Sequence, residues 1–221
     1  LHQRVEGKRQ GMRYTHWFWD FDGTLYNTYP RIVRAFQKAL KSRDIRMADE
    51  DIFPLVKNTL GHAARTIGGD EHAQALLDTY FEHAEDEGPD TLLPYKGVEE
   101  VLGFIVANGG RSYVYTHRDK TGPEALERAD LLRYFSDAIT DEDGFPSKPA
   151  PDALLHMIDK HGLNPRDCVM VGDRPIDLDA GINAGMQSIL FDEDGFYPEY
   201  PGVTRFESYA QMLEALKNGQ I

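Results

Sequence analysis

Acidic, hydroxyl and basic side chains recur after the apolar segments of this 221-residue sequence, and together they suit the chemistry of phosphate esters. Four aspartates in one place would repel each other, so a structure that keeps them needs a cation, and Mg²⁺ prefers oxygen ligands together with a substrate phosphate. A lysine and a threonine can bind phosphate oxygens, and a glycine lets backbone N–H groups approach them. The candidates are Asp20, Asp22, Gly23, Thr116, Lys148, Asp173 and Asp177. We therefore expect Mg²⁺-dependent phosphoryl transfer at this set of residues.

These residues can meet if the chain folds around a parallel sheet. Short apolar runs alternate with amphipathic helical patterns, which is typical of parallel strands covered by helices on both faces. In such a sheet, ligands bind beyond the carboxyl ends of the strands, and each candidate follows an apolar run or a turn. The predicted strands are residues 16–21, 112–115, 138–139, 168–171 and 188–191, and the predicted helices are residues 98–105, 123–134, 151–161, 176–184 and 209–216. We predict a doubly wound, Rossmann-like α/β core.

An all-helical cap is predicted between the first strand and the rest of the core. Apolar residues recur there at helical spacing, for example over residues 32–40 and 76–84, and no strand pattern is evident. The insert accounts for the 96 residues that separate Asp20 from Thr116, because the later intervals resemble single βαβ steps. We expect the core at residues 12–25 and 94–221 and the cap at residues 26–93.

The composition restricts the partners and the location of the protein. With 24 basic and 37 acidic residues the net charge is −13, which opposes attraction to nucleic acid. The single cysteine, Cys168, allows no intrachain disulfide, so we expect a reducing, cytoplasmic location. No apolar stretch approaches the roughly 20 residues that span a bilayer, so no membrane association is expected. Residues 1–11 lack the apolar block of a secretory signal and are expected to form an unordered or artificially added arm.

Four motifs together resemble those of the haloacid dehalogenase-like hydrolases. DFDGTL from Asp20 is similar to the first motif, and Thr116 after an apolar run is similar to the second. Lys148 within SKPAPD resembles the third, and GDRPIDLDAGINAG from Gly172 resembles the fourth. The resemblance extends over the chain after Met12, and the cap position is that of the subgroup with phosphoglycolate phosphatases and β-phosphoglucomutases. It implies a phosphatase of small phosphorylated metabolites.

The resemblance implies the roles of the first two aspartates. Asp20 would be the nucleophile and form an aspartyl-phosphate, because positioning and charge stabilisation govern phosphoryl transfer more than intrinsic nucleophilicity does. Asp22 would protonate the leaving oxygen and then deprotonate the attacking water. Family members that act on carbon–halogen bonds lack an acid at the position of Asp22. Its presence favours phosphate esters over haloacids.

The resemblance also implies a metal site and a phosphate site. Mg²⁺ would be held by the Asp20 carboxylate, the Asp22 main-chain carbonyl and the Asp173 carboxylate. Asp177 would either bind the ion through water or orient Lys148, and the sequence leaves both roles open. The phosphoryl oxygens would be bound by Thr116, Lys148 and the loop at Gly23.

Five further cationic or titratable residues are candidates for substrate specificity. Lys57, His62 and Arg65 lie in the predicted cap, which can offer cationic groups to the remote end of a substrate. An exposed helix face explains them equally well. His117 and Arg118 follow Thr116 and could reach the leaving group, or they could simply be solvated loop residues.

Two alternative functions remain open from the sequence. A β-phosphoglucomutase-like sugar phosphomutase would use the same Asp20 chemistry but return the phosphoryl group to a sugar. A phosphoacceptor receiver module, which serves signalling, also groups acidic residues, Thr and Lys around Mg²⁺. The DxDGT loop directly after the first strand and the helical insert count against a receiver.

Overall fold

The computed structural model describes residues 11–88, 91–197 and 200–221, and the chain divides into two compact units. Leu1–Thr24 and Tyr95–Ile221 form one unit, which we call the core unit. Leu25–Pro94 forms the other, the cap unit. The expectation for residues 1–11 lies outside the described residues, apart from Gly11.

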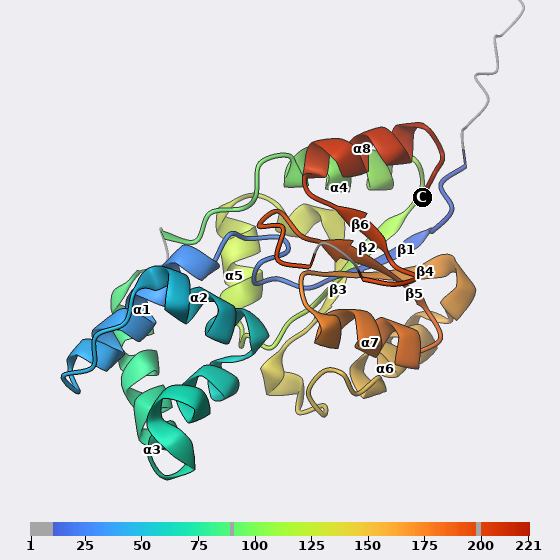
Figure 1. Cartoon of the computed structure of the whole chain (residues 1–221). Helices are drawn as coiled ribbons and strands as arrows, with labels where there is room; N and C mark the ends of the chain where they lie inside the picture. Colours follow the sequence, from blue (N-terminus) through green and yellow to red (C-terminus); the bar gives the residue numbers. More distant parts are fainter. Residues whose placement is uncertain (1–10, 89–90, 198–199) are drawn as a thin grey trace, which may run out of the picture. The chain divides into compact units, whose positions relative to one another are not determined.

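The described part of the core unit contains a parallel sheet of six strands in the order β3-β2-β1-β4-β5-β6 (Figure 1). Every neighbouring pair is parallel. The strands are β1 (His16–Trp19), β2 (Arg111–Tyr115), β3 (Phe135–Ile139), β4 (Cys168–Gly172), β5 (Gln187–Phe191) and β6 (Thr204–Phe206). The order reverses at β1, which creates a topological switch point between β1 and β4. The predicted doubly wound α/β fold is confirmed, whereas β6, with three residues, is too short to give a recognisable pattern and was not predicted.

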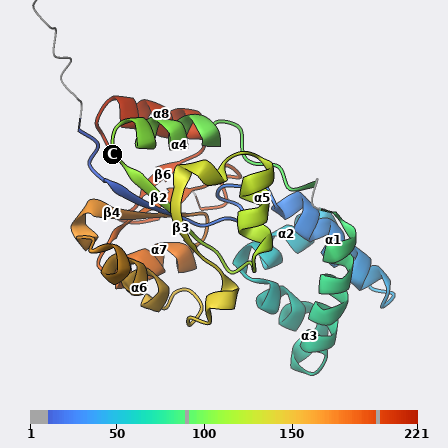
Figure 2. The same cartoon turned by 180° about the vertical axis from the view of Figure 1, so that it is seen from behind.

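Helices cover both faces of this sheet, as Figures 1 and 2 show from opposite sides. One face carries α4 (Val98–Ala107) and α8 (Tyr209–Lys217), and the other carries α6 (Asp152–His161) and α7 (Pro175–Asn183). Helix α5 (Thr121–Arg128) follows β2, and single 3₁₀ turns lie at Leu132–Tyr134, Asp141–Asp143 and Pro165–Asp167. Helix α8 begins with a side-chain cap, because the Ser208 hydroxyl accepts from the N–H of Gln211.

The predicted continuous helix over residues 123–134 is wrong. Helix α5 ends at Arg128, and Asp130 takes a left-handed conformation with φ of 57°. The N–H of Leu131 then turns back to donate to the carbonyl of Leu126 at 2.8 Å. Such a left-handed residue closes a helix by satisfying its last carbonyls, and Asp is among the few residues that adopt it readily.

Aromatic side chains of β1 anchor the two faces of the sheet. Trp17 and Trp19 point to one face and stack with their ring centroids 5.8 Å apart, while Phe18 points to the other face and stacks on Tyr113 at 4.7 Å. All four side chains are fully buried. The α8 residue Tyr209 packs against Trp19 and donates its hydroxyl to the carbonyl of Thr24 at 2.7 Å. The same packing therefore holds the loop that follows β1.

The cap unit is helical around an apolar core of its own. It contains α1 (Tyr29–Lys41), α2 (Asp49–Asn58) and α3 (Leu60–Asp86), and α3 is kinked at Gly69. The two helical patterns predicted at residues 32–40 and 76–84 lie within α1 and α3. The larger side chains of this core include Phe36, Leu40, Ile52, Leu76 and Tyr80.

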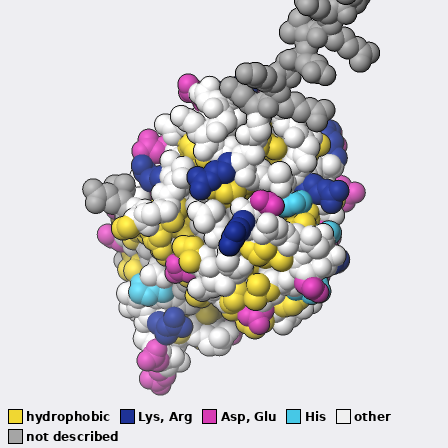
Figure 3. Space-filling view, turned by 90° about the vertical axis from the view of Figure 1, so that its right-hand side faces the viewer, with side chains coloured by type: hydrophobic (Ala, Val, Ile, Leu, Met, Phe, Trp, Pro, Cys, Tyr) yellow, Lys and Arg dark blue, Asp and Glu magenta, His cyan; other side chains and the backbone are white. Residues whose placement is uncertain are grey.

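Among the helices of the described residues, none combines the length and the apolar character that crossing a bilayer requires. On the face drawn in Figure 3, Lys and Arg side chains lie among Asp, Glu and hydrophobic side chains.

Two helical glycines allow a test of how closely α7 packs on the sheet. A Cβ atom on Gly181 of α7 would lie 2.6 Å from both Met170 Cβ and Ser188 Oγ. We expect Gly181→Ala to lower the free energy of unfolding by about 1 to 3 kcal/mol through overpacking, as measured by urea denaturation.

The matched control is Gly103→Ala in α4. Its Cβ would make only an ordinary contact, 3.8 Å from the Tyr134 ring, so we expect unchanged stability or a gain of up to about 1 kcal/mol from helix propensity. Equal stability of the Gly181→Ala variant and the wild type would contradict the close packing of α7.

Candidate active site

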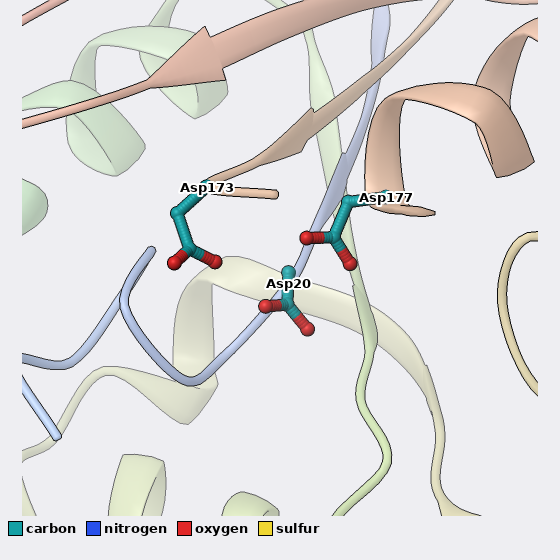
Figure 4. Close-up of side chains that lie close together, drawn as sticks. All are labelled: Asp20, Asp173 and Asp177. Carbon is teal, nitrogen blue, oxygen red and sulfur yellow. The ribbon is translucent and has the colours of Figure 1, made fainter. Parts of the chain in front are cut away.

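Three of the predicted aspartates converge at the switch point between β1 and β4. Asp20 follows β1, Asp173 follows β4, and Asp177 lies in the first turn of α7, and their side chains lie close together (Figure 4). One carboxylate oxygen from each lies within 4.8 Å of the other two, and all three residues are buried. The N–H of Asp20 donates to the carbonyl of Val171 at 2.9 Å, which ties the end of β1 to β4.

The ammonium group of Lys148 lies among these carboxylates. Its Nζ is 2.6 Å from Asp20 Oδ1 and 2.9 Å from Asp177 Oδ1, and it also donates to the main-chain carbonyl of Tyr115 at 2.9 Å. The side chains of Lys148 and Asp177 are fully buried. Breaking a buried pair of this kind by removing one partner leaves an uncompensated charge and typically costs about 3 to 5 kcal/mol.

Burial and charge shift the pKa values of these groups in different directions. Burial, followed by the negative charge of Asp177, raises the pKa of Asp20 to about 7. Burial would also raise the pKa of Asp177, but the Lys148 ammonium and Arg174 outweigh it, so that this pKa lies below its usual value. Burial disfavours the charged form of Lys148, yet the charges of Asp177 and Asp20 hold its pKa above the usual value.

The donor set fits a hard divalent cation. Asp20 Oδ2 is buried and has no hydrogen-bond partner among the described residues, while Oδ1 of the same carboxylate pairs with Lys148. The three acids of the cluster outnumber the two cationic side chains beside them, those of Lys148 and Arg174. Mg²⁺ takes carboxylate oxygens and retains waters for its other positions. A buried carboxylate oxygen without a hydrogen-bond partner in such an acidic cluster fits a ligand position for this ion.

Thr116 and Gly23 lie on the loops that follow β2 and β1. The Thr116 hydroxyl is buried and accepts from the N–H of Arg118 at 3.0 Å, so its own proton can be donated to another oxygen. Gly23 has φ of 74° in the turn closed by the N–H of Thr24 and the carbonyl of Phe21. This left-handed conformation is one that residues with a Cβ rarely adopt.

Asp22 occupies a different environment from Asp20. Its carboxylate accepts three hydrogen bonds from Arg118, namely from Nε at 3.0 and 2.9 Å and from Nη2 at 2.8 Å. The Arg118 guanidinium also lies over the Phe21 ring, 5.3 Å from its centroid. With 25% of its side chain exposed, Asp22 remains accessible to solvent.

His117 contacts the main chain of Lys148. Its Nε2 accepts from the Lys148 N–H at 3.1 Å, which requires a ring that is unprotonated at Nε2. Loss of hydration, followed by the positive charges of Lys148 and Arg174, lowers the pKa of His117, whereas Asp177 and Asp22 oppose the shift. The residue as a whole is exposed, so solvent screening reduces the size of these effects.

The remaining three candidates belong to the cap unit. The Lys57 ammonium lies over the Tyr29 ring, 4.6 Å from its centroid, and the residue is buried. The backbone N–H of His62 donates to the Thr59 hydroxyl, which caps the start of α3, and Arg65 is exposed on the same helix.

Sequence reasoning gave no role to three residues that contact the site. The Thr24 hydroxyl is 3.4 Å from Asp173 Oδ1, and Arg174 Nε lies 3.9 Å from Asp173 and 3.7 Å from Asp177. Thr24 lies in the DFDGTL motif and Arg174 in the GDRPID motif. Their positions in these motifs could have indicated that they lie near the site. Tyr115 gave no such signal, because an aromatic residue in an apolar run indicates only a buried strand.

Comparisons with known proteins match the chain to one family model and to named relatives. The family model described as haloacid dehalogenase-like hydrolase matches residues 18–191. A phosphoglycolate phosphatase of Mesorhizobium japonicum is 28% identical over 186 residues, covering 78% of this chain and 80% of that protein. The pyrophosphatase PpaX of Listeria welshimeri is 28% identical over 168 residues, covering 75% of this chain and 77% of that protein.

The fold of the chain is also similar to solved structures. A crystal structure described as a predicted phosphatase from Clostridium acetobutylicum superimposes with a TM-score of 0.79 and 19% identity, covering 94% of this chain and all of that one (100%). At this identity the likeness establishes the fold alone.

We predict that His117 remains neutral at physiological pH. Its ring should titrate below the ~6.5 of a free imidazole, because protonation at Nε2 would remove the acceptor of the Lys148 N–H. An NMR titration of the histidine ring signals, with His117 assigned from a His117→Gln variant, measures this midpoint.

The control is the same titration in urea, where the signal should return to ~6.5. Below that pH the unfolded chain takes up a proton that the folded chain does not, so His117 lowers the folding stability as the pH falls. A folded-state midpoint at or above the unfolded one would contradict the prediction.

Proposed function

This chain belongs to the haloacid dehalogenase-like hydrolase family, and from that premise we propose that it is a Mg²⁺-dependent phosphatase that hydrolyses small phosphate monoesters through Asp20. The observation that carries the proposal is the buried cluster of Asp20, Asp173 and Asp177 around Lys148 at the switch point of the sheet. Two relatives are named for the hydrolysis of phosphate compounds, which also supports it.

In this proposal the phosphoryl group of the substrate binds to donors on separate loops. The Thr116 hydroxyl and the Lys148 ammonium bind its oxygens, and the turn at Gly23 lets backbone N–H groups approach. Asp20, Asp173 and the main-chain carbonyl of Asp22 hold Mg²⁺. Once bound, Mg²⁺ supplies positive charge that offsets the carboxylates and the phosphoryl oxygens. Asp177 orients Lys148, which its 2.9 Å ion pair supports.

The reaction then proceeds in two steps. A carboxylate oxygen of Asp20 forms a bond to phosphorus, the ester bond breaks, and Asp22 gives its proton to the departing oxygen. In the second step Asp22 takes a proton from water, the hydroxyl oxygen bonds to phosphorus, and the bond between phosphorus and Asp20 breaks to release phosphate. Because Lys148 is buried, its charge stabilises the developing negative charge more strongly than it would in water.

The exposure of Asp22 supports its assignment as the acid and base. A group that exchanges protons with the leaving oxygen and with water must be accessible to both, and Asp22 is partly exposed where Asp20 is buried. The pair with Arg118 must loosen when Asp22 carries its proton, because a protonated carboxyl loses the attraction of a guanidinium.

The two alternatives differ from hydrolysis in their products. A phosphomutase would convert a sugar phosphate without releasing phosphate, and a receiver module would show no turnover of metabolite esters. We favour hydrolysis because the relatives are named as phosphatase and pyrophosphatase.

A screen of small phosphate esters tests the proposal. We expect phosphate release that requires Mg²⁺ and stops when EDTA is added, measured with a colorimetric phosphate assay on phosphoglycolate, sugar phosphates, nucleotides and phosphoamino acids. Asp20→Asn should lower the rate by about 10³-fold or more, because it removes the nucleophile.

Asp159→Asn serves as the matched control, since Asp159 is an exposed aspartate of α6 in the same unit. It should keep the wild-type rate. An Asp20→Asn variant that retains more than a few per cent of the activity would remove Asp20 from the nucleophilic role.

A comparison of leaving groups tests Asp22. Asp22→Asn should lose most activity toward alkyl phosphates, whose leaving oxygen needs a proton, but should still cleave p-nitrophenyl phosphate, whose leaving group departs as an anion. We expect one rapid equivalent of nitrophenol per enzyme, followed by slow turnover, because the base for the second step is missing.

Rapid mixing measures the burst, and intact-protein mass spectrometry measures the added phosphoryl group. If Asp22→Asn slows both ester classes equally and gives no burst, Asp22 is not the acid and base.

A further inference from the structure

We propose that Tyr115 is a positioning residue for Lys148, which it holds with its main-chain carbonyl and with the face of its aromatic ring. This proposal rests on the proposed function, in which Lys148 binds the phosphoryl group. Tyr115 is the last residue of β2 and immediately precedes Thr116. The motif that identified Lys148 gives no reason for an aromatic residue at position 115.

Two contacts join Tyr115 to the Lys148 ammonium. The carbonyl oxygen of Tyr115 accepts from Nζ at 2.9 Å, and Nζ lies 4.4 Å from the centroid of the Tyr115 ring. Asp20 and Asp177 are the other two partners of the same nitrogen. Asp20 Oδ1 and the Tyr115 carbonyl accept hydrogen bonds from this ammonium group, and Asp177 pairs with it through charge. The Tyr115 ring also lies against this ammonium group. Tyr115 and the two aspartates therefore enclose the ammonium group.

Strand geometry directs the Tyr115 ring to this place. Alternate residues of a strand face the same side, so Tyr115 shares the face of Tyr113, which stacks on Phe18. Both tyrosines belong to the apolar cluster on that side of the sheet, together with Ile139 and Leu154. The lysine thus meets an apolar layer that excludes water. An aromatic face in that layer attracts a cation, which an aliphatic side chain of similar size would not do.

The Tyr115 hydroxyl plays no visible part in this arrangement. It is buried and has no hydrogen-bond partner among the described residues. A buried hydroxyl without a partner costs free energy, so the hydroxyl does not explain why a tyrosine is found there. The ring and the carbonyl are the parts of Tyr115 that contact Lys148, and phenylalanine would preserve both.

The segment after β2 also holds the main chain of Lys148. His117 Nε2 accepts the Lys148 N–H, and the His117 ring stands edge-on to the Tyr115 ring, with the two planes at 90°. Lys148 is therefore held at both its backbone and its ammonium by one short stretch of chain. Such fixation matters because a donor displaced from the phosphoryl oxygens loses much of its effect on the transition state.

Kinetics of Tyr115 variants test the proposal. We expect Tyr115→Leu to lower kcat for phosphate-ester hydrolysis by about 5- to 30-fold, which corresponds to about 1 to 2 kcal/mol at 1.36 kcal/mol per factor of ten. KM should change far less, because the contact positions a group for the transition state. Tyr115→Phe should retain the wild-type kcat.

Tyr113→Leu is the matched control, because Tyr113 is a buried tyrosine on the same strand and the same face. It should lower the stability but leave kcat near the wild-type value. If Tyr115→Leu does not fold, Tyr115→Met replaces it, since the flexible methionine side chain fills irregular gaps.

A second measurement does not depend on activity. In the wild type, the ε-CH₂ protons of Lys148 should give an NMR signal that the ring current of Tyr115 shifts upfield. The shift should persist in Tyr115→Phe and disappear in Tyr115→Leu, with the signal assigned from Lys148→Arg.

The outcomes separate the positioning role from the proposed function. Absence of phosphate release from every ester by the wild type would overturn the phosphatase, and the NMR shift would still decide whether the ring covers Lys148. An unchanged kcat in Tyr115→Leu, an equal loss in Tyr115→Phe, or an unshifted wild-type signal would overturn the role of Tyr115.

Discussion

One buried ammonium group, that of Lys148, lies between two buried carboxylates, and the charge balance of the site depends on it. Ionised carboxylates are costly in the interior of a protein, and burial raises the pKa of Asp20 to about 7. Lys148 offsets part of this cost, but Asp173 adds a third carboxylate to the cluster. A divalent cation could neutralise the remaining negative charge. The excess of carboxylates over cationic side chains is therefore the electrostatic reason for the proposed metal.

The sheet topology makes this concentration of charge possible. Strands β1 and β4 are neighbours, and the chain order reverses at β1, so the loops after the two strands diverge and leave their ends open. Stacked aromatic residues of β1 hold these ends rigidly, and Tyr209 of α8 binds the carbonyl of Thr24. The apolar core therefore supports the polar site. Its packed aromatic side chains exclude water and fix the loops that supply the carboxylates.

Asp20 and Asp22 are two residues apart, yet their surroundings differ. Asp20 is buried beside Lys148, whereas Asp22 is partly exposed and is held by the planar guanidinium of Arg118. A compact ammonium suits the crowded interior, and a bidentate guanidinium suits a carboxylate near solvent. Different environments give carboxylates different protonation behaviour, which is the condition for dividing nucleophilic and acid–base roles between them.

The sequence by itself determined the α/β class, the helical insert and the strand ends that carry Asp20, Thr116 and Asp173, because hydrophobic periodicity is a local property of the chain. It did not predict the three-residue β6, and its predicted helix over residues 123–134 ran past the left-handed Asp130. Only the tertiary structure decided the pairings. Lys148 meets Asp20 across 128 residues, and Arg118 meets Asp22 across 96. The Tyr115 ring likewise acquires its place against Lys148 only in the fold, since contacts between distant residues depend on how the strands are ordered in the sheet.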